Sequence, residues 1–197
     1  MAPDRLPRLR RLLFSRRPGC DVDRLWTPWR YRYVSKAAPP DACIFCLKAS
    51  EQSDEENLVV HRGAHNFVLL NLYPYTNGHL MIAPYQHVAE LEAASPEACA
   101  EMMILMRRTC VALRELYRPA GLNLGMNIGE SAGAGVAGHI HMHVLPRWTG
   151  DASFMTTVGE TRVMPELLAE TWRRLRDAFP RTADRLSPPA ESPPPRS

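Results

Sequence analysis

The stretch that decides the fold is His139-Ile140-His141-Met142-His143-Val144-Leu145-Pro146, in which histidine and apolar residues alternate. An alternation with a period of two is typical of a β-strand, because its successive side chains point to opposite faces. We expect a strand over residues 138–146, with three imidazoles on one face and apolar side chains on the other. A single histidine beside a strand is usually structural, but three on one face leave several ring nitrogens that need partners. The pattern therefore indicates a chemical site.

Three adjacent imidazoles can carry out covalent chemistry at phosphorus. Imidazole is a competent nucleophile near neutral pH because much of it is unprotonated, and its phosphorus adduct remains reactive. Neighbouring histidines can donate to phosphate oxygens and protonate a leaving group, so no catalytic metal is expected. Just before this stretch, residues 129–135 (Gly-Glu-Ser-Ala-Gly-Ala-Gly) form a small-residue loop. Its backbone amides can cradle a phosphate, although glycines in a hairpin usually mean only tight turning.

The segments on either side of the histidine stretch predict further strands of a sheet. Four have strand patterns, at residues 58–60, 66–72, 80–83 and 122–128. The turn signal Asn77-Gly78 separates the second from the third, which suggests an antiparallel meander.

Two segments have helical spacing of apolar residues. Ser95 opens the first as a capping residue followed by Pro96, and Pro119 and Gly121 end it. Its apolar stripe consists of Met102, Met106, Cys110, Leu113 and Tyr117. The second helix follows Pro165 and stops at Pro180, with a stripe of Leu168, Trp172, Leu175 and Phe179. Amphipathic helices lying on an antiparallel sheet define the α+β class.

Length and composition favour one enzyme domain with flexible ends. The chain has 197 residues, 45% hydrophobic and 23% charged, and its net charge of +3 comes largely from arginines near the N-terminus. We expect a flexible basic extension over residues 1–24, a folded domain over 25–180 and a disordered proline-rich tail over 181–197. The basic charge is too local to imply a nucleic-acid partner.

The same sequence predicts a cytoplasmic protein that does not associate with membranes. Residues 1–24 lack the apolar core of a secretory signal, and no apolar run approaches the length of a membrane span. The five cysteines are an odd number without a long-loop pairing pattern, which argues against a secreted disulfide framework.

Residues 139–145 match in full the motif His-φ-His-φ-His-φ-φ, with φ apolar, and thereby resemble the histidine-triad superfamily. The resemblance extends over roughly residues 25–180. Three stretches are similar to the bacterial branch related to diadenosine tetraphosphate phosphorylases: Leu25-Trp-Thr-Pro-Trp-Arg30, Asn71-Leu-Tyr-Pro-Tyr-Thr-Asn-Gly-His79 and Pro146-Arg-Trp-Thr-Gly-Asp151. It implies a five-stranded antiparallel sheet with two main helices, and a homodimer whose two sheets join into one of ten strands.

The resemblance also implies catalytic roles for three histidines. The middle histidine of the motif is the family's nucleophile, which becomes nucleotidylated, and that role falls on His141. His143 would contact the phosphate, and His79 matches the histidine that supports the triad.

Four further residues are expected to bind substrate. Asn71 matches the family asparagine that holds the ribose hydroxyls, and Asn127 matches a phosphate-contacting residue before the glycine loop that contains Gly133 and Gly135. Many members carry glutamine or serine at the position of Gly135, so a side-chain contact to phosphate is missing here. Backbone amides of the loop can substitute for it.

Cys43-Ile-Phe-Cys46 supplies two thiols at the spacing of a metal knuckle. A thioredoxin-type redox pair is the alternative, but the stretch does not follow a strand in a βαβ context. The zinc-binding members of the superfamily complete the ligand set with two histidines that match His87 and His139. The resemblance therefore implies a structural zinc that ties the knuckle to the histidine strand.

The leading hypothesis is an enzyme that cleaves a dinucleoside polyphosphate or a related adenosine phosphate ester through a covalent nucleotidyl-histidine. The expected reaction is phosphorolysis of diadenosine tetraphosphate to ATP and ADP. The alternatives are a hydrolase of adenosine phosphoramidates or polyphosphates, a zinc-containing nucleotide-binding regulatory protein, and a redox switch at Cys43 and Cys46.

Overall fold

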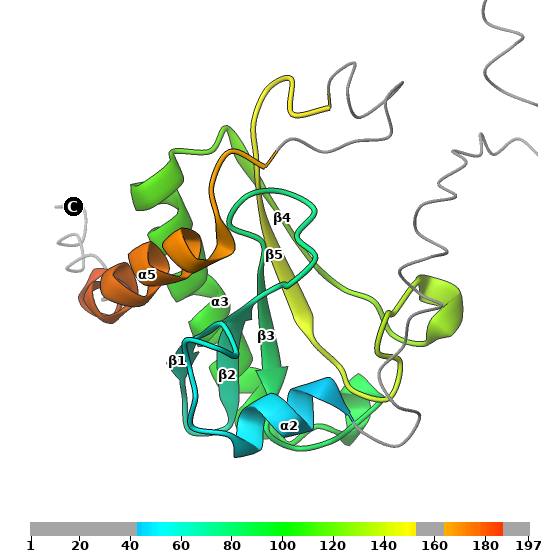
Figure 1. Ribbon diagram of the computed structural model, residues 1–197. Coiled ribbons are helices and arrows are strands. Elements are labelled where there is room, and N and C mark those ends of the chain that lie inside the picture. Colours follow the sequence, from blue (N-terminus) through cyan, green and yellow to red (C-terminus); the bar gives the residue numbers. More distant parts are fainter. Residues whose placement is uncertain (1–42, 153–163, 187–197) are drawn as a thin grey trace, which may run out of the picture. The chain divides into compact units, whose positions relative to one another are not determined.

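The computed structural model describes residues 43–152 and 164–186, which all lie in the compact unit Ala38–Ser197 (Figure 1). The predicted basic extension, the Trp26-Thr-Pro-Trp stretch and residues 187–197 of the predicted tail fall outside these ranges. Among the described helices, none has the combination of length and apolar character needed to cross a membrane.

Five antiparallel strands form one sheet, as predicted. They are β1 (Val59–Arg62), β2 (Asn66–Leu70), β3 (Leu80–Pro84), β4 (Gly121–Met126) and β5 (Met142–Arg147). Their order is β1-β2-β3-β5-β4, so the first three form the expected meander and β5 lies between β3 and β4. Every residue of β2 and β3 is buried, because both faces of the central strands are covered.

The histidine strand is shorter than predicted. It begins at Met142 rather than at residue 138, so His139 and His141 precede it. The pairing of β3 with β5 ends at Ile82 and Met142. If it continued for two more residues, Pro84 would lie opposite Ile140. Proline has no N–H to donate to a ladder, and the Ile140 N–H donates instead to the carbonyl of Val88 at 2.8 Å. The expected alternation survives only from Met142 onward.

Two of the helices confirm the sequence prediction. Helix α3 (Pro96–Tyr117) has Ser95 as its N-cap, whose hydroxyl accepts from the Ala98 N–H at 3.1 Å, and it ends at Arg118 in the left-handed conformation. Helix α5 (Leu168–Ala178) buries Trp172, whose indole N–H donates to the carbonyl of Val59.

A third helix, α2 (Ile44–Ser50), was not predicted. It is short, and its N-cap Cys43 makes no side-chain capping bond, so the sequence carries no clear start signal. Tertiary contacts hold it instead. Arg62 of β1 donates to the carbonyls of Lys48, Ala49 and Glu51 at its C-terminal end.

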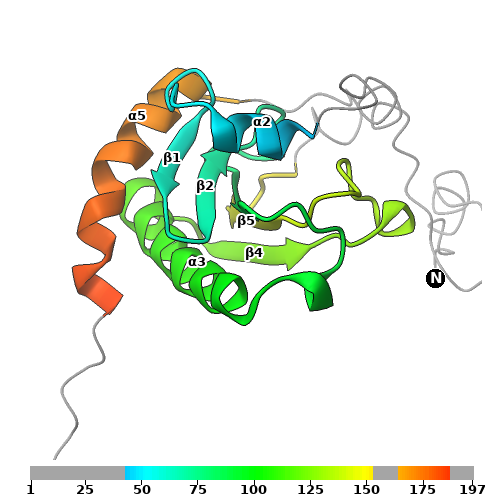
Figure 2. The same ribbon diagram turned by 90° about the horizontal axis from the view of Figure 1, so that it is seen from below.

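The sheet separates two apolar clusters. Figures 1 and 2 show α3 and α5 covering one face, where Val68, Leu80 and Val144 join the larger cluster with Leu113 and Leu175. Helix α2 lies on the other face, where Phe45 packs in a cluster with Phe67, Leu69, Met81 and Ala83. His143 pairs with Met81 across the ladder, so it faces the α2 side.

The chain remains ordered past residue 180, where the tail was expected to begin. Two 3-10 turns, Phe179–Thr182 and Asp184–Leu186, follow α5. Arg108 of α3 donates to the Thr182 hydroxyl and to the Phe179 carbonyl, both at 3.1 Å. Phe179, the last residue of the predicted apolar stripe, and Thr182 are both fully buried, so the packing continues past the predicted end of the domain.

Candidate active site and metal-ligand cluster

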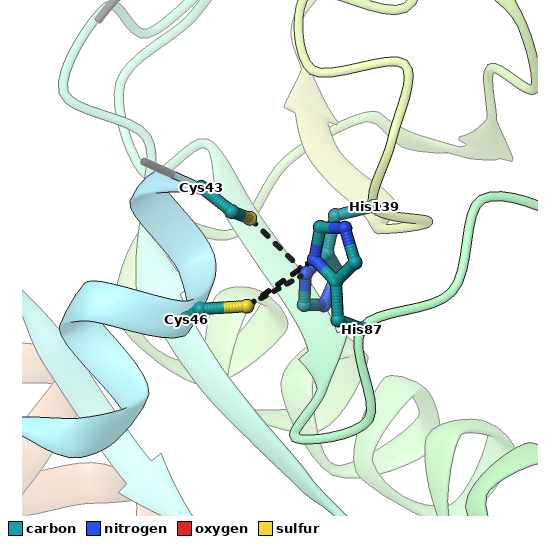
Figure 3. Close-up of side chains that lie close together, drawn as sticks. All are labelled: Cys43, Cys46, His87 and His139. Atoms are coloured by element: carbon teal, nitrogen blue, oxygen red, sulfur yellow. Dashed lines mark hydrogen bonds between the residues drawn. The ribbon is translucent and has the colours of Figure 1, made fainter. Parts of the chain in front are cut away.

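The four predicted metal ligands come together. Cys43 and Cys46 lie at the start of α2, His87 follows β3, and His139 precedes β5; their ligand atoms all lie within 4.8 Å of one another (Figure 3). The Sγ atom of Cys43 is 3.3 Å from Nδ1 of His139, and that of Cys46 is 3.3 Å from Nδ1 of His87. Three separate segments therefore converge on one point.

The chemistry of this cluster fits a tetrahedral metal ion. Two thiolates and two imidazoles form a ligand set that zinc favours. Nε2 of His139 lies 2.9 Å from the Pro84 carbonyl, which can only accept, so this nitrogen carries the proton and Nδ1 keeps a lone pair facing Cys43. A ligating histidine is usually oriented by such a second hydrogen bond.

The ring of His141 is held in a single tautomer. Its Nδ1 lies 2.9 Å from the backbone carbonyl of His139, so Nδ1 must be the donor and Nε2 has the lone pair. Burial lowers the pKa of His141, and the hydrogen bond to the carbonyl only partly offsets this effect. Near pH 7 the ring is therefore neutral, which is the state that a nucleophile requires.

A second chain of hydrogen bonds sets the tautomers of His79 and His143. The backbone N–H of Tyr75 donates to Nδ1 of His79 at 3.1 Å, so the proton of His79 is on Nε2. That nitrogen lies 2.9 Å from Nδ1 of His143, which must accept. His143 consequently carries its proton on Nε2 as a hydrogen-bond donor.

The three histidines thus form a complementary set. The rings of His141 and His143 are 4.8 Å apart and nearly perpendicular, with a nucleophilic nitrogen on one and an N–H donor on the other. The side chain of His79 is fully buried and supports His143 through its Nε2. This arrangement can attack an electrophilic phosphorus and protonate the departing oxygen.

Two aromatic residues contact the histidines and were not singled out in the sequence. The Phe45 ring, between the two cysteines, lies 4.7 Å from the ring of His141 and 5.1 Å from that of His139. The Tyr75 ring lies 4.7 Å from the ring of His79. In the sequence, the position of Phe45 between the two cysteines and that of Tyr75 beside the turn before His79 were the features that could have indicated these contacts.

Asn71 lies beside His79 rather than at an open surface. Its Oδ1 accepts from the Tyr73 N–H at 2.9 Å, which turns Nδ2 toward Nδ1 of His79 at 3.4 Å, and the residue is only 4% exposed. The asparagine therefore takes part in holding His79. Its contact with a ribose remains a prediction.

The glycine loop is held by Asn127, whose Nδ2 donates to the Gly133 carbonyl at 3.5 Å. Gly129 and Gly133 have φ of 77° and 87°, a conformation that favours glycine because it has no Cβ. Gly135 is exposed and is not among the glycines with positive φ. Gly129 and Gly133 therefore shape the turn, and the contact of Gly133 and Gly135 with phosphate remains a prediction.

Residues 52–150 match the family model described as the HIT domain. The chain belongs to the HIT domain family. It is 42% identical over 161 residues to the AP-4-A phosphorylase of Mycobacterium tuberculosis strain H37Rv, an alignment that covers 78% of this chain and 83% of that protein. The prediction of a histidine-triad enzyme is confirmed.

Solved structures of HIT proteins share the fold. A zinc-bound histidine-triad family protein from Mycobacterium smegmatis superposes with a TM-score of 0.59 at 30% identity, over 73% of this chain and 97% of that one. A hypothetical histidine-triad nucleotide-binding protein from Sulfolobus tokodaii gives a TM-score of 0.53 at 25% identity, over 73% and 93% of the two chains. The five-stranded HIT sheet is thereby confirmed.

Proposed function

We propose that this HIT protein cleaves a dinucleoside polyphosphate of the diadenosine tetraphosphate type through a nucleotidyl group on His141. The observation that carries the proposal is the hydrogen bond from Nδ1 of His141 to the His139 carbonyl, which leaves the opposite ring nitrogen nucleophilic. The relative named AP-4-A phosphorylase, 42% identical over 161 residues, supports the substrate class.

In the first step, Nε2 of His141 attacks the α-phosphorus of one nucleoside. An N–P bond forms and the P–O bond to the remaining polyphosphate breaks. His143 supplies a proton from Nε2 toward the leaving oxygen, because its Nδ1 is engaged by His79. In the second step, an oxygen of inorganic phosphate attacks the same phosphorus and the N–P bond breaks. Diadenosine tetraphosphate and phosphate thereby yield ATP and ADP.

Replacing His141 by alanine separates chemistry from binding. We expect His141→Ala to reduce turnover at least about a thousandfold, because no other group supplies the nucleophile, while nucleotide affinity stays close to that of the wild type. Steady-state rates and equilibrium binding measure the two effects. His65→Ala is the matched control, because His65 is an exposed histidine on the loop before β2 and should behave as wild type. Turnover by His141→Ala near the wild-type rate would show that the nucleophile is elsewhere.

Isotope-labelled inorganic phosphate distinguishes phosphorolysis from hydrolysis. We expect the label in the β-phosphate of ADP, because an anion positioned beside the adduct has a large effective-concentration advantage over water. Product analysis by mass spectrometry at saturating phosphate makes the measurement. If AMP forms and ADP carries no label, water resolves the adduct and the protein is a hydrolase of adenosine polyphosphates or phosphoramidates. If no turnover occurs despite nucleotide binding, a regulatory binding role is the better description.

We also propose that Cys43, Cys46, His87 and His139 hold one structural zinc. Their convergence and the Nδ1 lone pair of His139 support this, together with the zinc-bound relative of the same fold. The bound ion would join α2 to the segment before β5. It would leave His141 and His143 outside the coordination sphere, and no metal is expected in the chemical step.

Cys43→Ser should abolish zinc binding, because a hydroxyl is a poor zinc ligand, and should lower the melting temperature, since ligand binding contributes to folding. Elemental analysis and thermal unfolding provide the two measurements. Cys99→Ser is the control, because Cys99 lies in α3 outside the cluster. This variant should retain one zinc per chain. Full zinc occupancy in Cys43→Ser would reject the site.

We further propose a homodimer formed along β4. In the described part of the sheet, β4 has a hydrogen-bonded neighbour on one side only, and Leu124 on this strand is 46% exposed. Such an edge is a template for pairing with another strand. A cytoplasmic location and the lack of nucleic-acid or membrane partners stay predictions.

Light scattering tests the dimer at assay concentrations. We expect the mass of two chains for the wild type and of one chain for Leu124→Arg, because a buried arginine without a partner strongly opposes association. A monomeric wild type would remove the proposed dimer.

A further inference from the structure

Glu166 lies just before α5, outside the group of residues that the sequence singled out, and connects three parts of the fold. Its Oε2 accepts from the Tyr117 hydroxyl at the end of α3 at 2.6 Å, from the Thr171 hydroxyl of α5 at 2.7 Å and from Nδ2 of Asn77 at 3.1 Å. Its Oε1 accepts from Arg174. Burial raises the pKa of this carboxyl, but the four donors outweigh burial and bring the pKa to about 2. Glu166 is therefore a fixed anion at neutral pH.

Asn77 is the link between Glu166 and the histidines. It belongs to the turn that leads into β3, between Tyr75 and His79. Within this turn the His79 N–H donates to the Thr76 carbonyl, and the Tyr75 N–H donates to the ring of His79. The side-chain contact from Asn77 to Glu166 thus anchors the loop at a point between the two partners of the tautomer-setting hydrogen bond.

The tautomer of His79 matters because it determines that of His143. Nδ2 of Asn71 is a second and longer contact to Nδ1 of His79, at 3.4 Å, beside the Tyr75 N–H at 3.1 Å. If the Tyr75 N–H moved away, the shorter of the two contacts would be lost, and His79 could carry its proton on Nδ1 and accept through Nε2. His143 would then have to donate through Nδ1, and its Nε2 would become a lone pair. A lone pair cannot protonate a leaving oxygen, so the turn controls whether His143 can act as the acid.

We infer that Glu166 is a positioning residue for nucleotidyl transfer, which acts by holding Asn77 so that the Tyr75–Gly78 turn keeps His143 as an Nε2–H donor. The inference rests on the proposed function for the chemical consequence, but its structural part concerns ring tautomers alone. The turn also requires Gly78, whose φ of 75° favours glycine and whose position lies against Leu113 and Tyr117. The anchor and the conformation of the turn thus act together.

Two single variants weaken the hydrogen bond between Asn77 and Glu166 from opposite sides. Asn77→Ala removes the donor while leaving the other partners of Glu166 in place, and Glu166→Gln neutralises the acceptor with nearly the same shape. For both, we expect the single-turnover rate of nucleotidyl-His141 formation to fall by up to about a hundredfold, with KM changed little, because misplacement affects the chemical step. Nitrogen-15 NMR of the zinc-loaded, nucleotide-free protein should show mixed tautomers of His79 and His143.

A swap of the two groups provides the rescue. Glu166→Gln combined with Asn77→Asp restores an amide–carboxylate hydrogen bond in the reverse direction, and it should recover both the rate and the single tautomer. Asn77→Asp alone should be the most damaging, because it places two carboxylates together. Arg173→Ala is the matched control, because its exposed ion pair with Glu170 lies on the same helix and does not involve the turn.

The experiments distinguish failure of the role of Glu166 from failure of the proposed function. Wild-type rates and tautomers in both single variants, or a swap that rescues neither, would overturn the role of Glu166. If Asn77→Ala failed to fold, the comparison of Glu166→Gln with the swap would decide. If the wild type formed no nucleotidyl-His141, the proposed function would fail, while the tautomers would still report whether Glu166 controls His79 and His143.

Discussion

The site depends on the point where Pro84 ends the pairing between β3 and β5. Because proline cannot donate to the ladder, residues 138–141 leave the sheet, and the Ile140 N–H donates to the Val88 carbonyl in the connection after β3. The carbonyl of His139 then accepts from the ring of His141, and the carbonyl of Pro84 accepts from the ring of His139. One interruption in a sheet thus orients two neighbouring imidazoles for different tasks.

His139 joins the cluster of predicted metal ligands to His141, the proposed nucleophile. Its side chain faces the cysteines, while its backbone carbonyl sets the tautomer of His141. Phe45, located between the two cysteines, packs against the rings of both histidines. A displacement of α2 would therefore move the ring of His141, both through its packing against Phe45 and through the cluster, since tightly packed interiors transmit small shifts.

The buried histidines of the site are positioned by backbone atoms. His79, His139 and His141 are almost fully buried, and each has a hydrogen bond to a backbone N–H or carbonyl. A backbone donor or acceptor has a fixed polarity, so it selects one tautomer of an imidazole. The central strands β2 and β3, buried on both faces, supply the rigid frame that holds these atoms in place.

The sequence alone determined the features that depend on local pattern. The alternation from Met142 to Val144 specified a strand with His143 on one face, and Ser95 with Pro96 specified the start of α3, because both signals act between residues close in the chain. The resemblance to a known family predicted that Cys43, Cys46, His87 and His139 lie together. Tertiary structure decided the rest. The early end of the histidine strand, the short helix α2 and the contacts of Glu166 with Asn77 and Tyr117 depend on segments far apart in the chain. The turn of Asn71 toward His79 depends on the burial of both side chains. Such contacts are set by packing and by the need of each buried polar atom for a partner, which local periodicity does not encode.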